Sequence, residues 1–205
     1  MARSASSNRW LKRHVTDPYV RKARAQGYRS RAAFKLIEVN SRERLLIPGA
    51  RVADLGAAPG GWSQVAAEKV GSRGKVVAID LLEMSPLPGV VVLQGDFRDP
   101  AIHAAIASAA GGKLDVVLSD LSPNLSGIAS TDQARAAELV RLALEFSLEH
   151  LGSEGSFLVK VFQGTEFEEI LRELRQGFRK VRVLKPAASR EESRETYLLA
   201  RQLKH

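Results

Sequence analysis

Residues 54–62, Asp-Leu-Gly-Ala-Ala-Pro-Gly-Gly-Trp, carry the strongest chemical signal in this sequence. The apolar run 50–55 predicts a buried strand, and apolar residues at helical spacing follow the turn. A strand, a glycine-rich turn and a helix N-terminus bring several backbone N–H groups to one point, which suits a nucleotide or another adenosyl ligand. The alternative is a tight turn that binds no ligand.

The glycine turn differs from two common phosphate-binding patterns. It does not spell GxGxxG, and it lacks the Lys-Ser/Thr ending of a P-loop. An acid at the strand end, Asp54, favours a ligand with an ammonium group over a triphosphate. We therefore expect S-adenosylmethionine, bound near Asp54 and Gly56.

Acidic residues follow four successive predicted strands, namely Asp54, Asp80, Asp96 and Asp120. Asp80 lies 24 residues after Gly56, about the spacing at which an acid accepts hydrogen bonds from ribose hydroxyls. Asp96 could face the adenine edge. A single such acid is weak evidence because Asp commonly caps helices, but four in register around a glycine turn favour a ligand site.

Lys160 interrupts the apolar run 156–162, which predicts a central buried strand. A buried lysine is costly unless it is paired or neutral, although its ammonium could also reach solvent at the strand end. We expect Asp120 as its partner, because the fourth and fifth strands should be neighbours, and such a pair could be purely structural. Lys35 and Glu195 are two further charged candidates for the position beside Lys160. Each of them alone would be interpreted as a surface charge.

Alternating strands and helices should position these residues. Strands are predicted over 51–55, 75–81, 90–94, 114–119, 156–162, 180–185 and 196–202, and helices over 61–70, 99–109, 131–150 and 166–176. A further helix should carry Lys35, with Ser30 as its N-cap. The alternation predicts an α/β fold, a parallel sheet with helices on both faces. The last two strands, joined without a helix, should be antiparallel, and a turn is expected at 152–155.

The length and composition favour one domain, or one domain with an extension. The 205 residues are 44% hydrophobic, and no apolar run reaches the ~20 residues of a membrane span. The N-terminus has arginines but no apolar segment, so we do not expect it to be a secretory signal. Without cysteine, a thiolate nucleophile is excluded, and the composition suits the cytoplasm. Four scattered histidines lack metal-ligand spacing, so we expect no metal site.

Positive charge is concentrated at the N-terminus. Residues 1–37 contain ten Lys or Arg and one acid, whereas the whole chain has a net charge of +8. A basic arm on a nearly neutral domain indicates a polyanion partner, and Trp10 and Tyr19 could stack on bases. The alternative is a solvated tail that improves solubility.

Several blocks together resemble one known family. They are residues 29–36, 54–64, 120–127, 160–164 and 185–190, followed by Ser193, Glu195 and Tyr197. The chain resembles the FtsJ/RrmJ-type ribosomal RNA 2′-O-methyltransferases, specifically the bacterial large-subunit type, from about residue 10 to the C-terminus. It departs from the family at Leu121, Ser122 and Leu125, where Met, Ala and Met are expected.

The resemblance implies a fold, a cofactor and a catalytic site. The fold is a Rossmann-like, seven-stranded S-adenosylmethionine-dependent methyltransferase sheet whose last strand is antiparallel. We expect residues 1–28 to form a basic arm and 29–205 a single domain. The implied catalytic tetrad is Lys35, Asp120, Lys160 and Glu195. The implied S-adenosylmethionine contacts are Gly60, Trp62, Asp80, Asp96 and Asp120.

The expected reaction is methylation of a uridine ribose in large-subunit ribosomal RNA, by a monomer that grips the RNA with its arm. Lys160 would act as a neutral base or as a charged group that orients the oxygen, and the sequence leaves both open. Alternatives are a transfer RNA 2′-O-methyltransferase and a non-catalytic ribosome-assembly factor. A base methyltransferase is disfavoured, because residues 120–123 lack the Asn/Asp-Pro-Pro-Tyr/Phe pattern.

Overall fold

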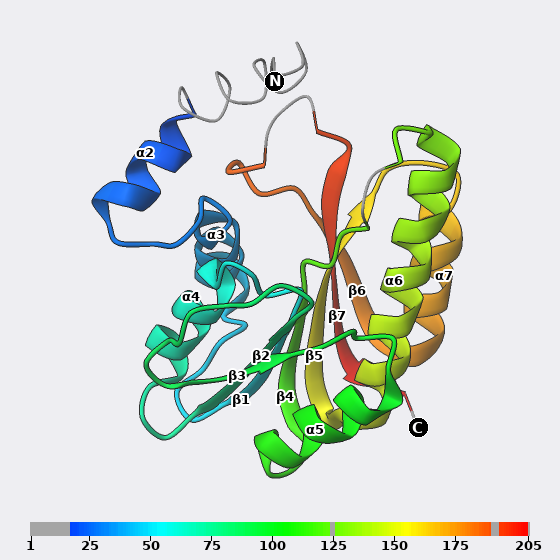
Figure 1. Cartoon of the computed structure of the whole chain (residues 1–205). Coiled ribbons are helices and arrows are strands. Elements are labelled where there is room, and N and C mark those ends of the chain that lie inside the picture. Colours follow the sequence, from blue (N-terminus) through cyan, green and yellow to red (C-terminus); the bar gives the residue numbers. More distant parts are fainter. Residues whose placement is uncertain (1–16, 124–125, 190–192, 205) are drawn as a thin grey trace.

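One mixed sheet of seven strands forms the centre of the protein (Figure 1). The computed structural model describes residues 17–123, 126–189 and 193–204. The strands are β1 (Arg51–Leu55), β2 (Lys75–Asp80), β3 (Val90–Gln94), β4 (Leu114–Ser119), β5 (Leu151–Phe162), β6 (Phe178–Leu184) and β7 (Glu195–Leu203). Their order in the sheet is β3-β2-β1-β4-β5-β7-β6.

The sheet is parallel except at its last strand. β1 to β5 pair in parallel, and β7 lies antiparallel to both β5 and β6. The predicted seven-stranded, Rossmann-like sheet with an antiparallel last strand is therefore confirmed. β1 lies between β2 and β4, so the direction of strand succession reverses there, and the carboxyl ends of these strands face a crevice of the kind in which α/β proteins bind ligands.

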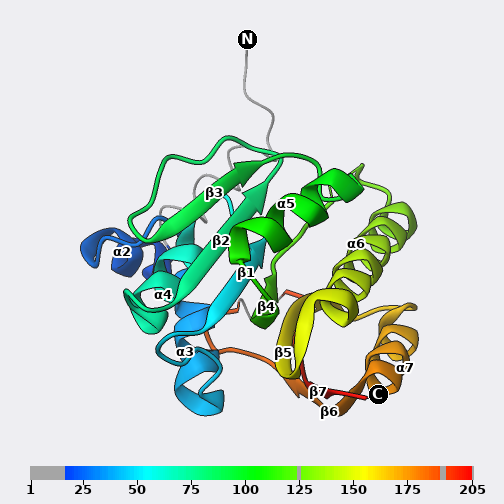
Figure 2. The same cartoon turned by 90° about the horizontal axis from the view of Figure 1, so that it is seen from below.

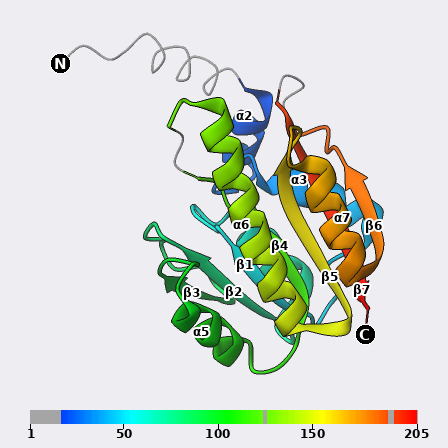
Figure 3. The same ribbon diagram turned by 90° about the vertical axis from the view of Figure 1, so that its right-hand side faces the viewer.

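Helices cover both faces of the sheet (Figure 2). They are α2 (Pro18–Ala25), α3 (Ala33–Glu43), α4 (Gly61–Val70), α5 (Pro100–Ala110), α6 (Ala129–His150) and α7 (Phe167–Gly177). One apolar cluster joins α3 and α4 to the sheet, and a second joins α5, α6 and α7 to its other face. In Figure 3, α6 and α7 lie side by side, with α6 packed against β5 and α7 against β6. None of the helices in the described ranges is long and apolar enough to cross a membrane.

Two local predictions were wrong. Ser30 does not cap a helix: α3 begins at Ala33, and its N-cap position, Ala32, makes no side-chain capping bond. Ser30 instead packs against the start of α4, where a Cβ on Gly61 would come within 2.3 Å of its Oγ. The turn expected at 152–155 lies inside β5, where the pairing with β4 shifts register.

Helix α2 lies within the predicted basic arm and is attached to the domain. Asp17 caps it, accepting a hydrogen bond from the Tyr19 N–H, and forms an ion pair with Arg31. The Tyr19 ring lies 5.6 Å from that of Phe34 on α3. The Asp17-Pro18 sequence is a helix-start signal that could have predicted α2. The boundary at residue 28 stays a prediction, and Trp10 lies outside the described residues.

Candidate active site

A cleft opens at the carboxyl ends of β1, β2, β3 and β4. It has a volume of about 690 Å³, and its wall includes five residues singled out from the sequence: Gly56, Asp80, Asp96, Asp120 and Lys160. Apolar side chains and two charged residues of α6 complete the wall, notably Leu81, Leu82, Phe97, Leu121, Arg135 and Glu138. A cleft of this size lies within the range of about 300–1,000 Å³ that is typical of small-molecule sites.

The glycines of the turn lie at positions that disfavour a side chain. Gly56 has φ +77°, and a Cβ there would lie 3.0 Å from the backbone of Leu121. Gly60 has φ +106° and forms the N-cap of α4. The N–H groups of Gly56 and Ala57 both donate to the carbonyl of Ile79, which fixes the turn against the end of β2.

Asp80 and Asp96 have different hydrogen-bond partners within the protein. The Asp80 carboxylate accepts from the Ala58 N–H at 2.9 Å and from the Leu82 N–H at 2.8 Å, so it ties the glycine turn to the loop after β2. Asp96 is more exposed and pairs with Arg98, whose hydrogen bonds lower the pKa of the Asp96 carboxyl. Both carboxylates line the cleft wall.

Three predicted cofactor residues do not reach the cleft wall. Asp54 lies within β1 rather than after it and is fully buried. The Trp62 ring is 3% exposed, its Nε1 donates to the Ala32 carbonyl at 2.9 Å, and it packs against Tyr197. Gly60 is also absent from the lining. The contact of these three residues with a cofactor stays a prediction.

Lys160 is buried on β5 and held by three acceptors. Its Nζ lies 3.0 Å from Asp120 Oδ1 and 2.8 Å from the Asp120 carbonyl oxygen, and it also donates to Ser122 Oγ. The expected pairing with Asp120 is confirmed, and β4 and β5 are neighbours in the sheet. Three acceptors match the three N–H groups of an ammonium.

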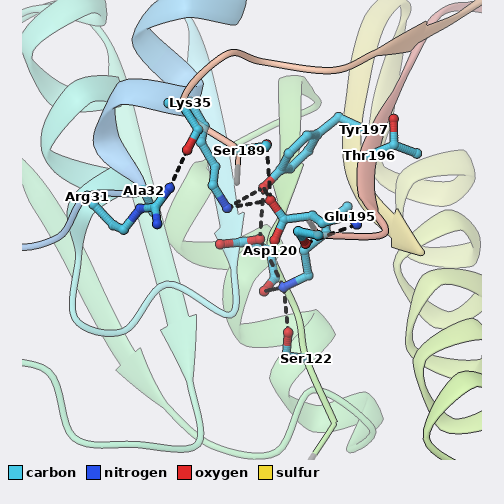
Figure 4. Close-up of polar contacts among 12 residues, drawn as sticks. Arg31, Ala32, Lys35, Asp120, Ser122, Ser189, Glu195, Thr196 and Tyr197 are labelled. Atoms are coloured by element: carbon cyan, nitrogen blue, oxygen red, sulfur yellow. Dashed lines mark hydrogen bonds and ion pairs between the residues drawn. The ribbon is translucent and has the colours of Figure 1, made fainter. Parts of the chain in front are cut away.

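A second lysine–carboxylate pair, Lys35 with Glu195, lies beside Asp120 (Figure 4). Lys35 Nζ on α3 is 2.5 Å from Glu195 Oε1 and 3.1 Å from Tyr197 Oη. The Tyr197 hydroxyl lies 3.0 Å from Glu195 Oε1 and 3.5 Å from Asp120 Oδ1, so it joins the two lysine–carboxylate pairs. The structure thus brings together Lys35, Asp120, Lys160 and Glu195.

Burial and neighbouring charges shift the pKa values of Glu195 and Tyr197 in opposite directions. Burial alone would raise the pKa of Glu195, but the charge and hydrogen bond of Lys35, the charge of Lys160 and the Tyr197 hydroxyl together lower it. The pKa of Tyr197 is raised well above its usual value of 10.0, by burial first and then by the charges of Asp120 and Glu195. Tyr197 therefore remains a neutral hydroxyl between two carboxylates.

The sequence analysis did not place Tyr197, Ser122 or Ser189 in the site. Ser189 Oγ lies 3.3 Å from Glu195 Oε1. A signal for Tyr197 was available, since residues two apart on a strand share a face and Tyr197 follows Glu195 by two. The antiparallel register also places Tyr197 opposite Lys160. No comparable pattern marks the two serines.

A model of the FtsJ-like methyltransferase family matches residues 28–203. The chain belongs to this family. It is 52% identical to the ribosomal RNA large subunit methyltransferase E of Chromobacterium violaceum and 50% identical to that of Pseudomonas aeruginosa, in each case over 202 residues and 98% of both chains. A crystal structure from Plasmodium falciparum, described as a ribosomal RNA methyltransferase, matches with a TM-score of 0.75 and 28% identity, over 86% of this chain and 98% of that chain.

The cleft of this FtsJ-like methyltransferase fits S-adenosylmethionine, the methyl donor expected for the family. That molecule carries a sulfonium and an ammonium, and three carboxylates line the cleft: Asp80, Asp96 and Asp120. Gly56, which lies too close to Leu121 to carry a side chain, leaves room beside them. Phe97 and the leucines supply apolar surface for a purine ring.

Asp54 should make the stability of the folded protein depend on pH. Burial raises its pKa from 3.8 to about 7, with smaller contributions from the charges of Asp120 and Asp80, against the opposing hydrogen bond from Ser63. The folded state therefore holds the proton more tightly, and this stabilisation, full below about pH 4, is lost as the pH rises through about 7. Between pH 5 and pH 8, wild type should lose about 3 kcal/mol of unfolding free energy relative to Asp54→Asn.

Urea unfolding at the two pH values measures this difference. Glu83→Gln, which removes an exposed carboxylate from the loop after β2, is the control and should follow wild type. Parallel pH dependences for wild type and Asp54→Asn would contradict a protonated Asp54.

Proposed function

We propose that this methyltransferase transfers the methyl group of S-adenosylmethionine to the 2′-hydroxyl of a uridine ribose in the 23S ribosomal RNA of the large subunit. The observation that carries the proposal is a buried lysine, Lys160, held beside Asp120 on the wall of the cofactor cleft. The names of the relatives from Chromobacterium violaceum and Pseudomonas aeruginosa support ribosomal RNA as the target.

The substrate hydroxyl needs alignment and loss of its proton, because a ribose 2′-hydroxyl is a poor nucleophile. S-adenosylmethionine supplies an electrophilic methyl group when it is bound. We assign to Lys160 Nζ a position close to the 2′-oxygen, where its positive charge stabilises the developing oxyanion. The three acceptors around Nζ favour this charged role over that of a neutral base. The Asp120 carboxylate, beside it on the same wall, accepts the proton.

Lys35, Glu195 and Tyr197 have a positioning role in this proposal. Glu195 keeps its negative charge, since its pKa is lowered, and it holds the Lys35 ammonium in place. Tyr197 links this pair to Asp120. The arrangement keeps two positive charges close to the ribose without direct contact between the two ammonium groups.

The RNA contact proposed for the N-terminal arm rests on α2 and the residues before it. Arg21, Lys22 and Arg24 are exposed on α2 and could reach phosphates. Two other cations of the segment act inside the protein: Arg31 pairs with Asp17, and Arg29 donates to the carbonyls of Pro59, Ser85 and Pro86. These two of the ten cations in residues 1–37 are therefore already bound within the protein, and both lie after the arm. We place the enzyme in the cytoplasm as a monomer.

Two alternatives remain to be tested against this function. A transfer RNA methyltransferase would use the same chemistry on another RNA. A non-catalytic assembly factor would have no use for two lysines and two acids held within hydrogen-bonding distance at a cofactor cleft.

The target is tested with labelled methyl donor. Large ribosomal subunits lacking the modification, small subunits and transfer RNA are incubated with the enzyme, and the labelled nucleotide is mapped. We expect a single 2′-O-methyluridine in 23S ribosomal RNA. Labelling of transfer RNA instead of the large subunit would contradict the proposed target, and a label on a base would contradict the proposed reaction.

Removal of the Lys160 ammonium should slow turnover strongly with little effect on cofactor binding. Groups that act on the transferred proton or the charge contribute about 10²–10⁴-fold to rates, so kcat of Lys160→Ala should fall by that factor. S-adenosylmethionine affinity, measured by calorimetry, should change little. Lys113→Ala removes an exposed lysine at the far end of β4 and should retain wild-type activity. Retained methyl transfer by Lys160→Ala would contradict the assignment.

A further inference from the structure

The outer edge of the sheet carries a group of cations remote from the active site. Arg179 and Lys180 are exposed on β6, Arg175 is exposed in the last turn of α7, and Lys204 follows β7. All four border one surface hollow of about 500 Å³. We call these four residues the basic edge patch. Figure 3 shows β6 at the end of the sheet beside α7.

The charge of the patch is not neutralised by neighbouring acids. Arg182, farther along β6, pairs with Glu43 at 2.7 Å, and Glu154 on β5 binds an amide side chain of β7. Within the described part of the chain, none of the four patch side chains forms an ion pair. Lys204 Nζ donates to the carbonyl of Arg175, which leaves its charge intact. The patch therefore presents uncompensated positive charge to solvent.

The backbone of β6 adds to this surface. β6 is the terminal strand and pairs only with β7, so the N–H groups on its outer side point away from the sheet. Cationic side chains next to free N–H donors are suited to phosphate oxygens. The alternative is that Lys and Arg on an edge strand only prevent pairing with the edge of another sheet.

The patch lies at a defined distance from the reaction. β6 begins at Phe178, which pairs with Leu203, and ends at Leu184, which pairs with Tyr197 of the active site. Six residue steps at about 3.3 Å each separate the two ends by about 20 Å. An RNA bound at the active site must extend at least that far to reach the patch, as a folded ribosomal RNA does and a single nucleotide does not.

We propose that the basic edge patch binds the phosphate backbone of ribosomal RNA about 20 Å from the target ribose. The inference rests on the proposed function, since it needs a large RNA as substrate. The contact is independent of base sequence and separate from the N-terminal arm. Two separate contacts would fix the orientation of a large RNA. The patch therefore contributes to the affinity for the particle and leaves the methyl-transfer step unchanged.

The test compares two triple variants with equal loss of charge. The patch variant carries Arg175→Gln, Arg179→Gln and Lys180→Gln, and it keeps Lys204 because that side chain binds the end of α7. The control variant carries Lys69→Gln, Arg73→Gln and Lys75→Gln, which lie exposed near the amino end of β2. Binding to unmodified large subunits is measured over a range of KCl concentrations, with melting curves and cofactor affinity as checks of folding.

We expect the patch variant to bind about 10- to 100-fold more weakly at 0.1 M KCl, with a slope of log K against log salt shallower by about 2. The control variant should resemble wild type, and kcat at saturating subunits should be the same for both. Equal binding by the two variants would overturn the proposal. The cations would then serve only to prevent β6 from pairing with the edge of another sheet. Weaker binding to subunits with unchanged binding to protein-free 23S ribosomal RNA would also overturn it, because the partner would then be a ribosomal protein. If the proposed function itself is wrong, the wild-type protein will not methylate large subunits, and this outcome is distinct from those of the binding test.

Discussion

The buried charge of Lys160 constrains the rest of the active site. An ammonium removed from water is costly unless every N–H group finds an acceptor and an opposite charge lies close by. Asp120 supplies the charge and a carbonyl oxygen, and Ser122 supplies a hydroxyl. Such a group cannot relax into solvent, so the lysine is held in one position at the cleft. That fixed position is what an enzyme needs in order to align a weak nucleophile.

Sheet topology creates this environment. β4 delivers Asp120 next to β5, and the antiparallel β7 places Tyr197 directly opposite Lys160 and Glu195 two residues before it. α3 then brings Lys35 over the sheet from the other end of the chain to meet Glu195. Residues from four elements converge because the carboxyl ends of β4 and β5 and the start of β7 lie at the same edge. The methyl-donor cleft occupies the neighbouring part of that edge, so one set of strands serves both.

The fold and the Lys160–Asp120 pair could be predicted from strong local patterns, whereas Lys35 and Glu195 were assigned to the site only through the family resemblance. A lysine in an apolar strand needs a partner, and alternating elements make the fourth and fifth strands neighbours. Asp54 was misplaced for a physical reason: it lies one residue inside β1, so it shares a face with Val52 and points toward α4, where Ser63 binds it. The predicted strand 51–55 matches β1, so Asp54 was misplaced because its direction within the strand was not considered, and not because the strand end was wrong. The internal use of Arg29 and Arg31 depends on contacts between distant loops, which composition does not encode.

The central claim is that Lys160 and Asp120 act as one unit on the ribose hydroxyl. A double-mutant cycle on kcat, with Lys160→Ala, Asp120→Ala and the double variant at saturating cofactor and subunits, tests it most directly. If the pair acts as a unit, the double variant should be no more than about threefold slower than the slower single variant, because either change alone disables the pair. Effects that multiply in the double variant would show that the two residues contribute independently, and would contradict the account.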